Sequence, residues 1–285
     1  MQFRTIVDIP SPTFSIAPCE EMLFVGSCFA DNIGRRFSDE MFRATVNPFG
    51  VMYNPASILH TVQRTTVAPR VAVFTLGTNH VYILKETGEI VDNCQKRPQR
   101  LFEERELSVD ECADYLRQTI NILHQRRSNV QIIITVSPIR YAKYGYHGSQ
   151  LSKATLLLAA DKLAKEFAPS SQQQSHDNAS ASEQSGAVVT YFPAYEIVND
   201  ELRDYRFYAD DMLHPSAVAV EYIWQRMVDT FFSDEAKAFM KAWAPIKRGL
   251  AHRPLNPDSA EYKTFHAKLM ADAEALKHRY PNMPF

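Results

Sequence analysis

The chain has 285 residues, a formal net charge of −2 and 45% hydrophobic residues, enough for one large domain or two small ones with a buried core. Its 31 Lys and Arg residues nearly balance its 33 Asp and Glu residues, which gives no electrostatic signature of a nucleic-acid or anionic-membrane partner. Only 9 residues are glycine, well below the usual share of roughly 7%, which excludes collagen-like and Gly-rich linker proteins.

Neither a membrane span nor a secretory leader is visible in the sequence. No stretch approaches the roughly 18 apolar residues of a span, and charged residues and prolines interrupt the apolar residues of Met1–Pro18. The cysteines at positions 19, 28, 94 and 112 have no C-x-x-C spacing, so neither a zinc site nor a disulfide framework is indicated. We expect a reduced, cytoplasmic protein without a bound metal.

Short apolar runs of strand length alternate with amphipathic helical patterns along the chain. The strand-like runs are Met22–Val25, Val71–Leu76, Gln131–Val136 and Val188–Phe192. The helical stripes begin at Phe29, Cys112, Leu156 and Val220, and each repeats at a spacing of three or four residues. Near-continuous apolar strands between amphipathic helices predict an α/β sandwich around a mainly parallel sheet.

Two segments interrupt this alternation. His80–Lys85 and Glu89–Asp92 flank a Glu-Thr-Gly turn, which predicts an inserted β-hairpin. Pro169–Gly186 is rich in Ser and Gln, and we expect a mobile loop there because it offers little apolar surface to bury.

The core pattern ends near Phe232, so we expect a main domain over residues 1–232 and a C-terminal helical extension over residues 233–285. Asp234–Trp243 and Ser259–Tyr280 read as its helices, and we expect them to pack on the main domain or on another subunit. A homo-oligomer formed through these helices is therefore an open expectation.

The first candidate for chemistry is the junction between the first strand and the first helix. Ser27 follows Gly26 there, at the carboxyl edge of the predicted sheet, where open α/β folds bind their ligands. Its backbone N–H and the helix N-terminus would stabilise an oxyanion. The structural alternative is an ordinary Ser helix cap. Cys28 is a rival nucleophile, but we expect it to be a buried core thiol.

The second candidate is the Asp211-Met212-Leu213-His214 segment ahead of the last core helix. An Asp three residues before a His is close enough to hold the imidazole by its Nδ1 atom, which leaves Nε2 free as a base. In isolation the segment also reads as a solvated acidic turn. Combined with Ser27, it fits a nucleophile, base and orienting acid.

Two turns could complete an oxyanion hole. Gly50 closes the turn Asn47–Gly50 and would let the backbone approach a ligand closely. Asn79 follows the second core strand and carries an amide donor. Ordinary turn chemistry explains both turns equally well.

Gly26–Ala30 reads GSCFA, and it resembles the signature of the GSCFA family, a branch of the SGNH (GDSL-like) hydrolases. Later blocks agree in order over roughly residues 20 to 230. They are Asn47–Gly50, Thr75–Thr78, Ser137–Arg140, His147–Ala154 and Asp211–Ser216.

This resemblance implies a three-layer α/β/α sandwich with a flavodoxin-like, five-stranded, mainly parallel sheet. It also implies that Ser27 is the nucleophile, His214 the base and Asp211 the orienting acid. The implied oxyanion donors are the N–H groups of Ser27 and Gly50 and the side chain of Asn79, although the match at Gly50 is looser. Family members often carry His where this chain has Gln95, so the chain departs from the family pattern at this position.

Polar residues that follow the third core strand could line a substrate pocket. Arg140, His147 and Gln150 are the candidates, and Arg140 or Lys153 could meet an anionic group. A polar loop with a charged helix start explains them equally well.

The sequence as a whole predicts an SGNH-type serine hydrolase or acyltransferase that acts on O-acyl esters of a carbohydrate or small metabolite. Such chemistry needs no cofactor, because side chains alone carry it. The alternative is a non-catalytic binding module on the same fold with an idle triad. A flavodoxin-like nucleotide binder is a weaker alternative, because the sequence has no Gly-rich phosphate loop.

Overall fold

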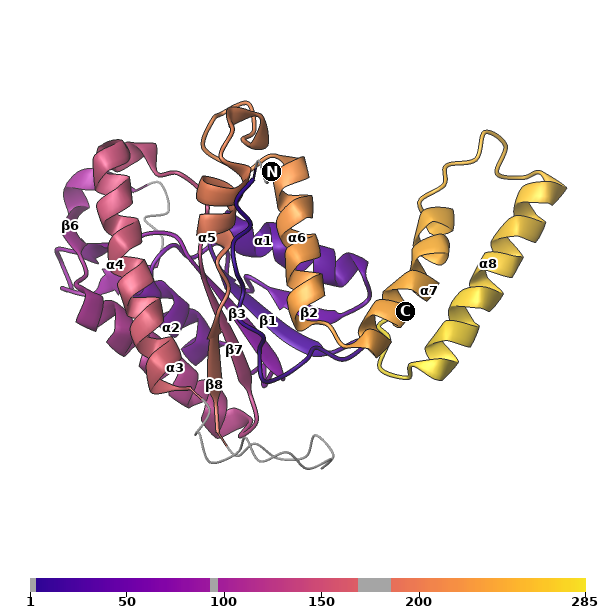
Figure 1. Ribbon diagram of the computed structural model, residues 1–285, viewed down its shortest axis with the longest axis horizontal. Helices are drawn as coiled ribbons and strands as arrows, with labels where there is room; N and C mark the ends of the chain where they lie inside the picture. The colour runs from indigo at the N-terminus through magenta and orange to yellow at the C-terminus, as the bar shows by residue number, and fades with distance from the viewer. Residues whose placement is uncertain (1–3, 93–96, 169–185) are drawn as a thin grey trace.

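The computed structural model describes residues 4–92, 97–168 and 186–285 (Figure 1). At its centre lies a five-stranded sheet in the order β2-β1-β3-β7-β8, in which all neighbouring strands run parallel. The strands are β1 (Glu21–Gly26), β2 (Arg43–Val46), β3 (Val71–Leu76), β7 (Gln131–Val136) and β8 (Val188–Tyr191). This confirms the expected parallel sheet with flavodoxin-like order.

Because successive side chains of each strand point to opposite faces of the sheet, the protein has two hydrophobic cores, one on each face. Met22 and Phe24 of β1 pack with α1 (Cys28–Asp39) and α6 (Ala217–Phe231). Leu23 and Val25 point the opposite way. They pack with α2 (Pro55–Arg64), α3 (Val109–Arg126) and α4 (Gly145–Glu166). Helices therefore cover both faces of the sheet, which confirms the three-layer sandwich (Figure 1).

The inserted hairpin is confirmed and is part of a larger antiparallel sheet. β4 (His80–Leu84) pairs with β5 (Ile90–Val91) on one side and with β6 (Phe102–Glu106) on the other. A short 3₁₀ turn, η1 (Gln99–Leu101), leads into β6. β6 lacks the apolar pattern of a strand and was not predicted, because four of its five residues are charged.

A series of short elements runs along the carboxyl edge of the parallel sheet. η2 (Ala142–Tyr144) follows β7 and leads into α4. α5 (Ala194–Glu196), a π-helical turn η4 (Ile197–Leu202) and η5 (Tyr205–Phe207) follow β8 and lead to α6. In Figure 1 the segment between η4 and α6 lies at the upper end of the sheet, where α4 also begins.

Two expectations concern segments that the structure describes little or not at all. Gln95 lies outside the described residues, and so does the predicted loop over residues 169–186 apart from Gly186.

The chain ends in a pair of helices, α7 (Asp234–Leu250) and α8 (Ala260–Arg279), that project from the sandwich (Figure 1). Their contact with it centres on Trp243, which is 1% exposed and donates from Nε1 to the Asp39 carbonyl oxygen at 2.9 Å. Lys247 pairs with Glu40 at 2.8 Å beside this bond. None of the helices in the described part of the chain is both long and apolar enough to cross a membrane.

Candidate functional site

The junction of β1 and α1 is built on a glycine that no other residue can replace without strain. Gly26 has φ +149°, and a Cβ added to it would lie 2.3 Å from the Thr75 carbonyl oxygen. This close approach brings the next residue, Ser27, against the end of β3. Ser27 then begins α1 as its N-cap, and its hydroxyl accepts from the Phe29 N–H at 3.2 Å.

The Ser27 side chain is buried at the carboxyl edge of the sheet. It is 0% exposed, and its hydroxyl donates to the Ser137 hydroxyl at 2.9 Å and lies 3.1 Å from the Thr75 hydroxyl. Its backbone N–H donates to the Thr75 carbonyl at 3.1 Å and to the Thr75 hydroxyl at 3.0 Å. The Ser27 hydroxyl and N–H are thus both engaged inside the protein.

Cys28 is the first residue of α1 and differs from the expected buried core thiol, because it is only partly buried. Its side chain lies close enough to Tyr53, in the loop after β2, to affect the pKa of the Tyr53 hydroxyl. Burial raises the pKa of the Tyr53 hydroxyl, and the neighbouring Cys28 raises it further. The Tyr53 ring meets the Tyr141 ring edge to face, with centroids 5.8 Å apart.

Asp211 and His214 form the pair that their spacing predicts. The Asp211 Oδ2 atom lies 2.6 Å from His214 Nδ1, and Oδ1 accepts from the backbone N–H groups of Leu213 and His214, both at 2.9 Å. These backbone bonds, with the imidazole, hold the pKa of Asp211 down at about 2. A carboxylate on Nδ1 keeps the proton there, so Nε2 is the free nitrogen of His214.

The loop that carries His214 is fastened to the end of β7. Arg140 donates from its backbone N–H to the Leu213 carbonyl at 3.0 Å and from its guanidinium to the Met212 carbonyl at 3.1 Å. His214 and the β1–α1 junction therefore share the carboxyl edge of the sheet. Among the described residues, no hydrogen bond joins the Ser27 hydroxyl to His214.

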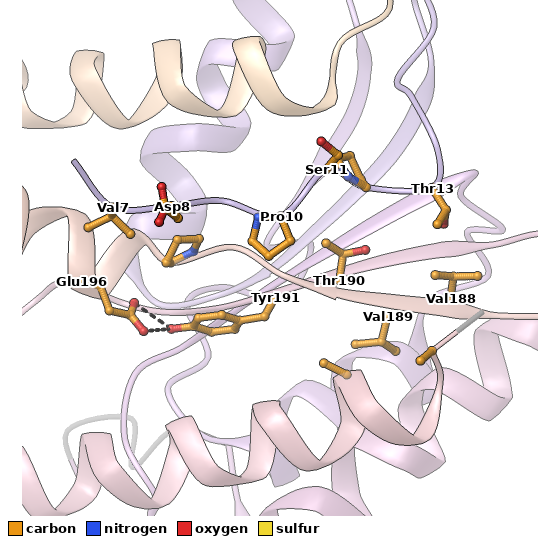
Figure 2. A pocket seen from close by; sticks show the side chains of 14 residues that line it. Val7, Asp8, Pro10, Ser11, Thr13, Val188, Val189, Thr190, Tyr191 and Glu196 are labelled. Carbon is orange, nitrogen blue, oxygen red and sulfur yellow. Dashed lines mark hydrogen bonds between the residues drawn. The ribbon is translucent and has the colours of Figure 1, made fainter. Parts of the chain in front are cut away.

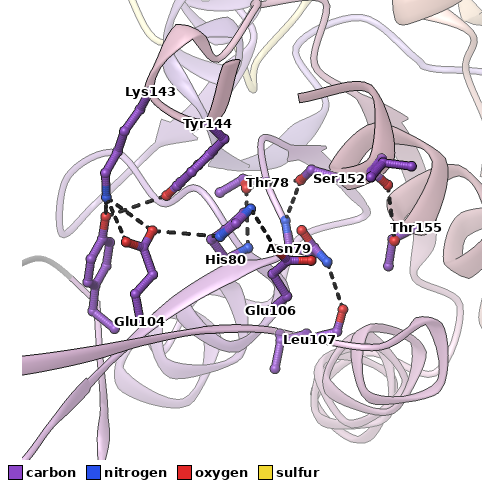
Figure 3. A network of polar contacts seen from close by, with 12 residues as sticks. Thr78, Asn79, His80, Glu104, Glu106, Leu107, Lys143, Tyr144, Ser152 and Thr155 are labelled. Atoms are coloured by element: carbon purple, nitrogen blue, oxygen red, sulfur yellow. Dashed lines mark hydrogen bonds and ion pairs between the residues drawn. The ribbon is translucent and has the colours of Figure 1, made fainter. Parts of the chain in front are cut away.

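The three donors expected to form an oxyanion hole are each bonded within the protein. Besides the Ser27 N–H, the Gly50 N–H donates to the Asn47 carbonyl at 2.8 Å. The Asn79 amide donates to the Leu107 carbonyl at 2.8 Å (Figure 3). Both turns lie at the carboxyl edge of the sheet, but the donors they carry are bonded to acceptors within the protein.

Asn79 belongs to a polar network that joins the inserted sheet to the segment after β7 (Figure 3). His80 stacks on Tyr144 with ring centroids 3.6 Å apart, and Lys143 pairs with Glu104 at 3.0 Å. Burial lowers the pKa of His80, although the neighbouring Glu104 and Glu106 oppose this shift. This network holds η2, and thus the residues next to Tyr141, in place.

Lys153 acts as a buried clamp that sequence reasoning considered only as a substrate contact. It is 2% exposed, and its ammonium donates to the carbonyl oxygens of Gly77 at 2.7 Å and Ser137 at 2.8 Å. The clamp ties together the carboxyl ends of β3 and β7. Burial lowers the pKa of Lys153 to about 7.

The substrate-binding candidates separate in the structure. Arg140, Gln150 and Lys153 line a small cavity of about 40 Å³, together with Tyr146 and Tyr195. The Tyr195 hydroxyl donates to Gln150. His147 is exposed and is not among the lining residues of this cavity.

A larger cavity, of about 470 Å³, lies along the free edge of β8 (Figure 2). The N-terminal segment and α4 form its other walls, and Tyr191 donates to the Glu196 carboxylate at its end. Burial raises the pKa of Glu196. The lining residues include neither Ser27 nor His214, so this cavity is separate from the candidate site. Across the described part of the chain, no three His, Cys, Asp or Glu side chains gather as a metal site.

Comparisons with known proteins were made for the sequence and for the fold of the chain. No curated protein sequence matches the chain. Among solved structures, an acetyl esterase mutant crystallised with an acetate ion is similar at 12% identity and a TM-score of 0.40, covering 78% of this chain and 98% of that chain. A carbohydrate esterase of family 3 from Talaromyces cellulolyticus is similar at 12% identity and a TM-score of 0.37, with the same two coverages.

The sequence profile of the GSCFA family matches residues 21–70 and 62–227, and a profile of the GSCFA domain protein's C-terminal domain matches residues 243–285. The first match spans the five strands and the loop that carries His214. The chain therefore belongs to the GSCFA family.

Proposed function

We propose that this protein is an acyl hydrolase or acyltransferase that acts on O-acyl esters of a carbohydrate or small metabolite. The observation that carries the proposal is the Asp211–His214 pair, whose carboxylate is bonded to both Nδ1 and the loop backbone. An imidazole fixed in this tautomer presents a free Nε2 atom as a general base. Two candidate nucleophiles, Ser27 and Cys28, follow β1 at the same edge of the sheet.

In the proposed mechanism His214 removes a proton from a nucleophile at the β1–α1 junction, and the nucleophile attacks the acyl carbonyl. Asp211 stabilises the imidazolium that forms. His214 then returns the proton to the departing alcohol, which leaves an acyl-enzyme. Water or an acceptor alcohol releases the acyl group in the second half of the reaction. These steps use side chains alone and need no cofactor.

The GSCFA resemblance supports Ser27 as the nucleophile of a Ser27–His214–Asp211 triad. For Ser27 to act, its hydroxyl must leave Ser137 and Thr75 and become accessible from a 0% exposed position. The cost of leaving buried partners unsatisfied is about 1–3 kcal/mol for each group. A rearrangement of the sheet edge is therefore part of any mechanism that uses Ser27.

The substrate side of the site is expected to accept a polar or anionic group. Arg140 lies beside the His214 loop and stacks over the Tyr146 ring at 4.2 Å, and Lys153 and Gln150 share its small cavity. The Arg140 guanidinium favours a carboxylate or another group rich in acceptor atoms. The Lys153 ammonium is already bonded to the carbonyl oxygens of Gly77 and Ser137. His147 is exposed and would contact only the outer part of a substrate.

The test is hydrolysis of a panel of p-nitrophenyl esters, from acetyl to octanoyl, by the wild type and by His214→Ala. Loss of a general base lowers kcat/KM by about 10²–10⁴-fold. His252→Ala is the matched control, because His252 lies beyond α7 in the C-terminal region. Equal activity of the wild type and His214→Ala would contradict the proposal.

A non-catalytic binding module remains a second candidate, and one observation favours it. The Ser27 hydroxyl and the three donors expected at the oxyanion hole are all bonded within the protein. A module of this kind would turn over no ester in the panel, and its ligand affinity would be unchanged in His214→Ala.

A further inference from the structure

We propose that a polar cavity beside the inserted sheet is a binding site for a neutral sugar unit, separate from the acyl-transfer site. The cavity has a volume of about 670 Å³, within the usual range of ligand pockets in proteins. Residues of α2 and α3 line it, together with residues of the β4–β5 hairpin and of β6. Neither Ser27 nor His214 is a lining residue, so the inference does not require that the protein cleaves esters.

The cationic side chains of this cavity are paired with carboxylates. His60 Nδ1 lies 2.6 Å from the Asp92 carboxylate, and the Arg64 guanidinium lies 3.7 Å from its other oxygen. Arg105 pairs with Glu111 at 2.6 Å. The hydrogen bond to Asp92 raises the pKa of His60. Each cationic group among these lining residues therefore has an acidic partner, which leaves no surplus positive charge to select an anion such as phosphate.

Other lining groups remain available for hydrogen bonds with a ligand. Among the described residues, no hydrogen bond involves the Gln63 amide, the Glu89 carboxylate or the Tyr115 hydroxyl. His60 uses Nδ1 for Asp92, so its Nε2 atom is also available. The cavity thus offers both donors and acceptors. A sugar hydroxyl donates and accepts in the same way, so this mixed set of groups fits a polyhydroxylated, uncharged ligand.

The cavity also has an apolar part that suits the carbon face of a sugar ring. Ile83 and Ile90 are direct partners in the β4–β5 pair, and both are partly exposed. Tyr115 adds an aromatic ring from α3. Gly88 leaves the hairpin turn open, because an added Cβ would meet no atom within 4 Å. Sugar rings carry C–H groups on their faces and hydroxyls at their edges, so such a ligand would use both the apolar and the polar part.

Arg64 connects the cavity to the candidate site. Its guanidinium lies 4.0 Å from the centroid of the Phe49 ring, and Phe49 is 40% exposed. Phe49 directly precedes Gly50 in the turn after β2. The cavity therefore borders the turn at the carboxyl edge of the sheet. Where the substrate is a carbohydrate ester, as the proposed function has it, the cavity would hold a sugar next to the acylated one.

The test is the binding of unesterified sugars to the full-length chain. The probes are the methyl glycosides of glucose, galactose, xylose and N-acetylglucosamine, each measured by saturation-transfer-difference NMR and titrated for its Kd. We expect at least one glycoside to bind, with the same Kd in the wild type and in His214→Ala. Absence of saturation transfer to all four glycosides would overturn the inference and leave the proposed function intact.

Substitutions in the cavity assign the binding to it. In Gln63→Ala and in Glu89→Ala we expect the Kd of the bound glycoside to rise about 10-fold, because each variant removes a hydrogen-bonding group. Both side chains are exposed, so the melting temperature should stay within a few degrees of the wild type. Gln118→Ala is the matched control, since Gln118 is exposed on α3 and does not line the cavity. An unchanged Kd in both cavity variants would overturn the inference, because the sugar would then bind elsewhere.

Inorganic phosphate is the competing ligand. Titrated into the glycoside complex, it should not displace the sugar. Displacement that disappears in Arg64→Ala would show an anion site in the cavity and overturn the inference.

Hydrogen exchange followed by mass spectrometry locates the bound glycoside independently of the variants. Amide exchange should slow in α2 and in residues 80–92, and it should be unchanged in the loop that carries His214. Slower exchange in the His214 loop alone would overturn the inference. Failure of the ester panel with sugar binding intact would contradict the proposed function and leave the sugar site standing.

Discussion

Asp211 uses both carboxylate oxygens, one for the imidazole and one for the loop backbone. In Asp211→Asn the oxygen can still accept from the backbone, but the amide donates to Nδ1 and so favours the wrong tautomer of His214. We expect kcat/KM to fall by about 10²–10⁴-fold with little change in the melting temperature. Steady-state kinetics with the ester panel measures the effect. A variant within threefold of the wild type would show that His214 does not act as a base.

The depressed pKa of Asp211 also has a consequence for stability at low pH. Its folded-state pKa of about 2 lies below its ordinary value of 3.8, so its stabilising contribution is present above pH 4 and is lost as the pH falls toward 2. We expect acid unfolding of Asp211→Asn to depend less on pH within this window. The contribution is small because the side chain is exposed. Acid titration of the circular dichroism signal checks it.

Lys153 predicts a pH dependence in the same direction but over a higher pH range. Burial lowers its pKa from 10.5 to about 7, so the unfolded chain binds more protons between these values. The free energy of unfolding should therefore rise as the pH increases from about 7 to 9.

In Lys153→Met this slope should be flatter, whatever the absolute stability of the variant. Urea unfolding at both ends of the pH window measures the slope, and Lys241→Met, at an exposed position, is the matched control. Equal slopes in the wild type and Lys153→Met would contradict a lysine that loses its proton in the folded state.

The β1–α1 junction also shows which features of the site the sequence can predict and which it cannot. The GSCFA motif at Gly26–Ala30 predicted a candidate site at the β1–α1 junction. The spacing of Asp211 and His214 predicted the hydrogen bond between the Asp211 carboxylate and His214 Nδ1 that the structure shows. A sequence cannot show which of two adjacent side chains faces the interior. The answer depends on the φ of Gly26 and on the hydroxyls of Thr75 and Ser137, which come from distant strands.

At the scale of elements, the turn between β1 and α1 requires a residue without a side chain. Gly26→Ala would place a methyl group 2.3 Å from the Thr75 carbonyl at φ +149°, so we expect a loss of about 3 kcal/mol or more in the free energy of unfolding. Gly88→Ala is the control for φ alone. It has φ +73° and nothing within 4 Å, and should cost about 1–2 kcal/mol. Urea unfolding of both variants tests this, and equal losses would contradict the steric account.

Strand prediction succeeded for the apolar strands of the parallel sheet, including the edge strand β8, and missed β2 and β6. β3 and β7 are buried along their whole length and match the predicted runs residue for residue. β2 is a four-residue edge strand that begins with an exposed Arg43, and β6 is largely charged. Both depend on partner strands that periodicity does not reveal.

At the scale of the whole molecule, the C-terminal helices are held by a local contact around Trp243. Trp243→Ala should cost about 3–5 kcal/mol of local stability, because it removes a buried ring and the bond to the Asp39 carbonyl. Amide exchange of α7 and α8 should then accelerate while ester turnover stays unchanged.

Phe265→Ala is the control, since Phe265 is 44% exposed on α8. Hydrogen exchange followed by mass spectrometry separates the two outcomes. Faster exchange throughout the central sheet would show that the helices and the sandwich unfold as one unit.

The central claim is that the β1–α1 junction carries an acyl group in turnover, with His214 as the base. The most direct measurement is the mass of the intact protein, acid-quenched within the first turnover of an activated ester, for the wild type and for His214→Ala. We predict one added acyl group per wild-type chain, located on the Ser27–Cys28 peptide, and acylation at least about 100-fold slower in His214→Ala. Acylation at another position, or at the same rate in both proteins, would contradict the account.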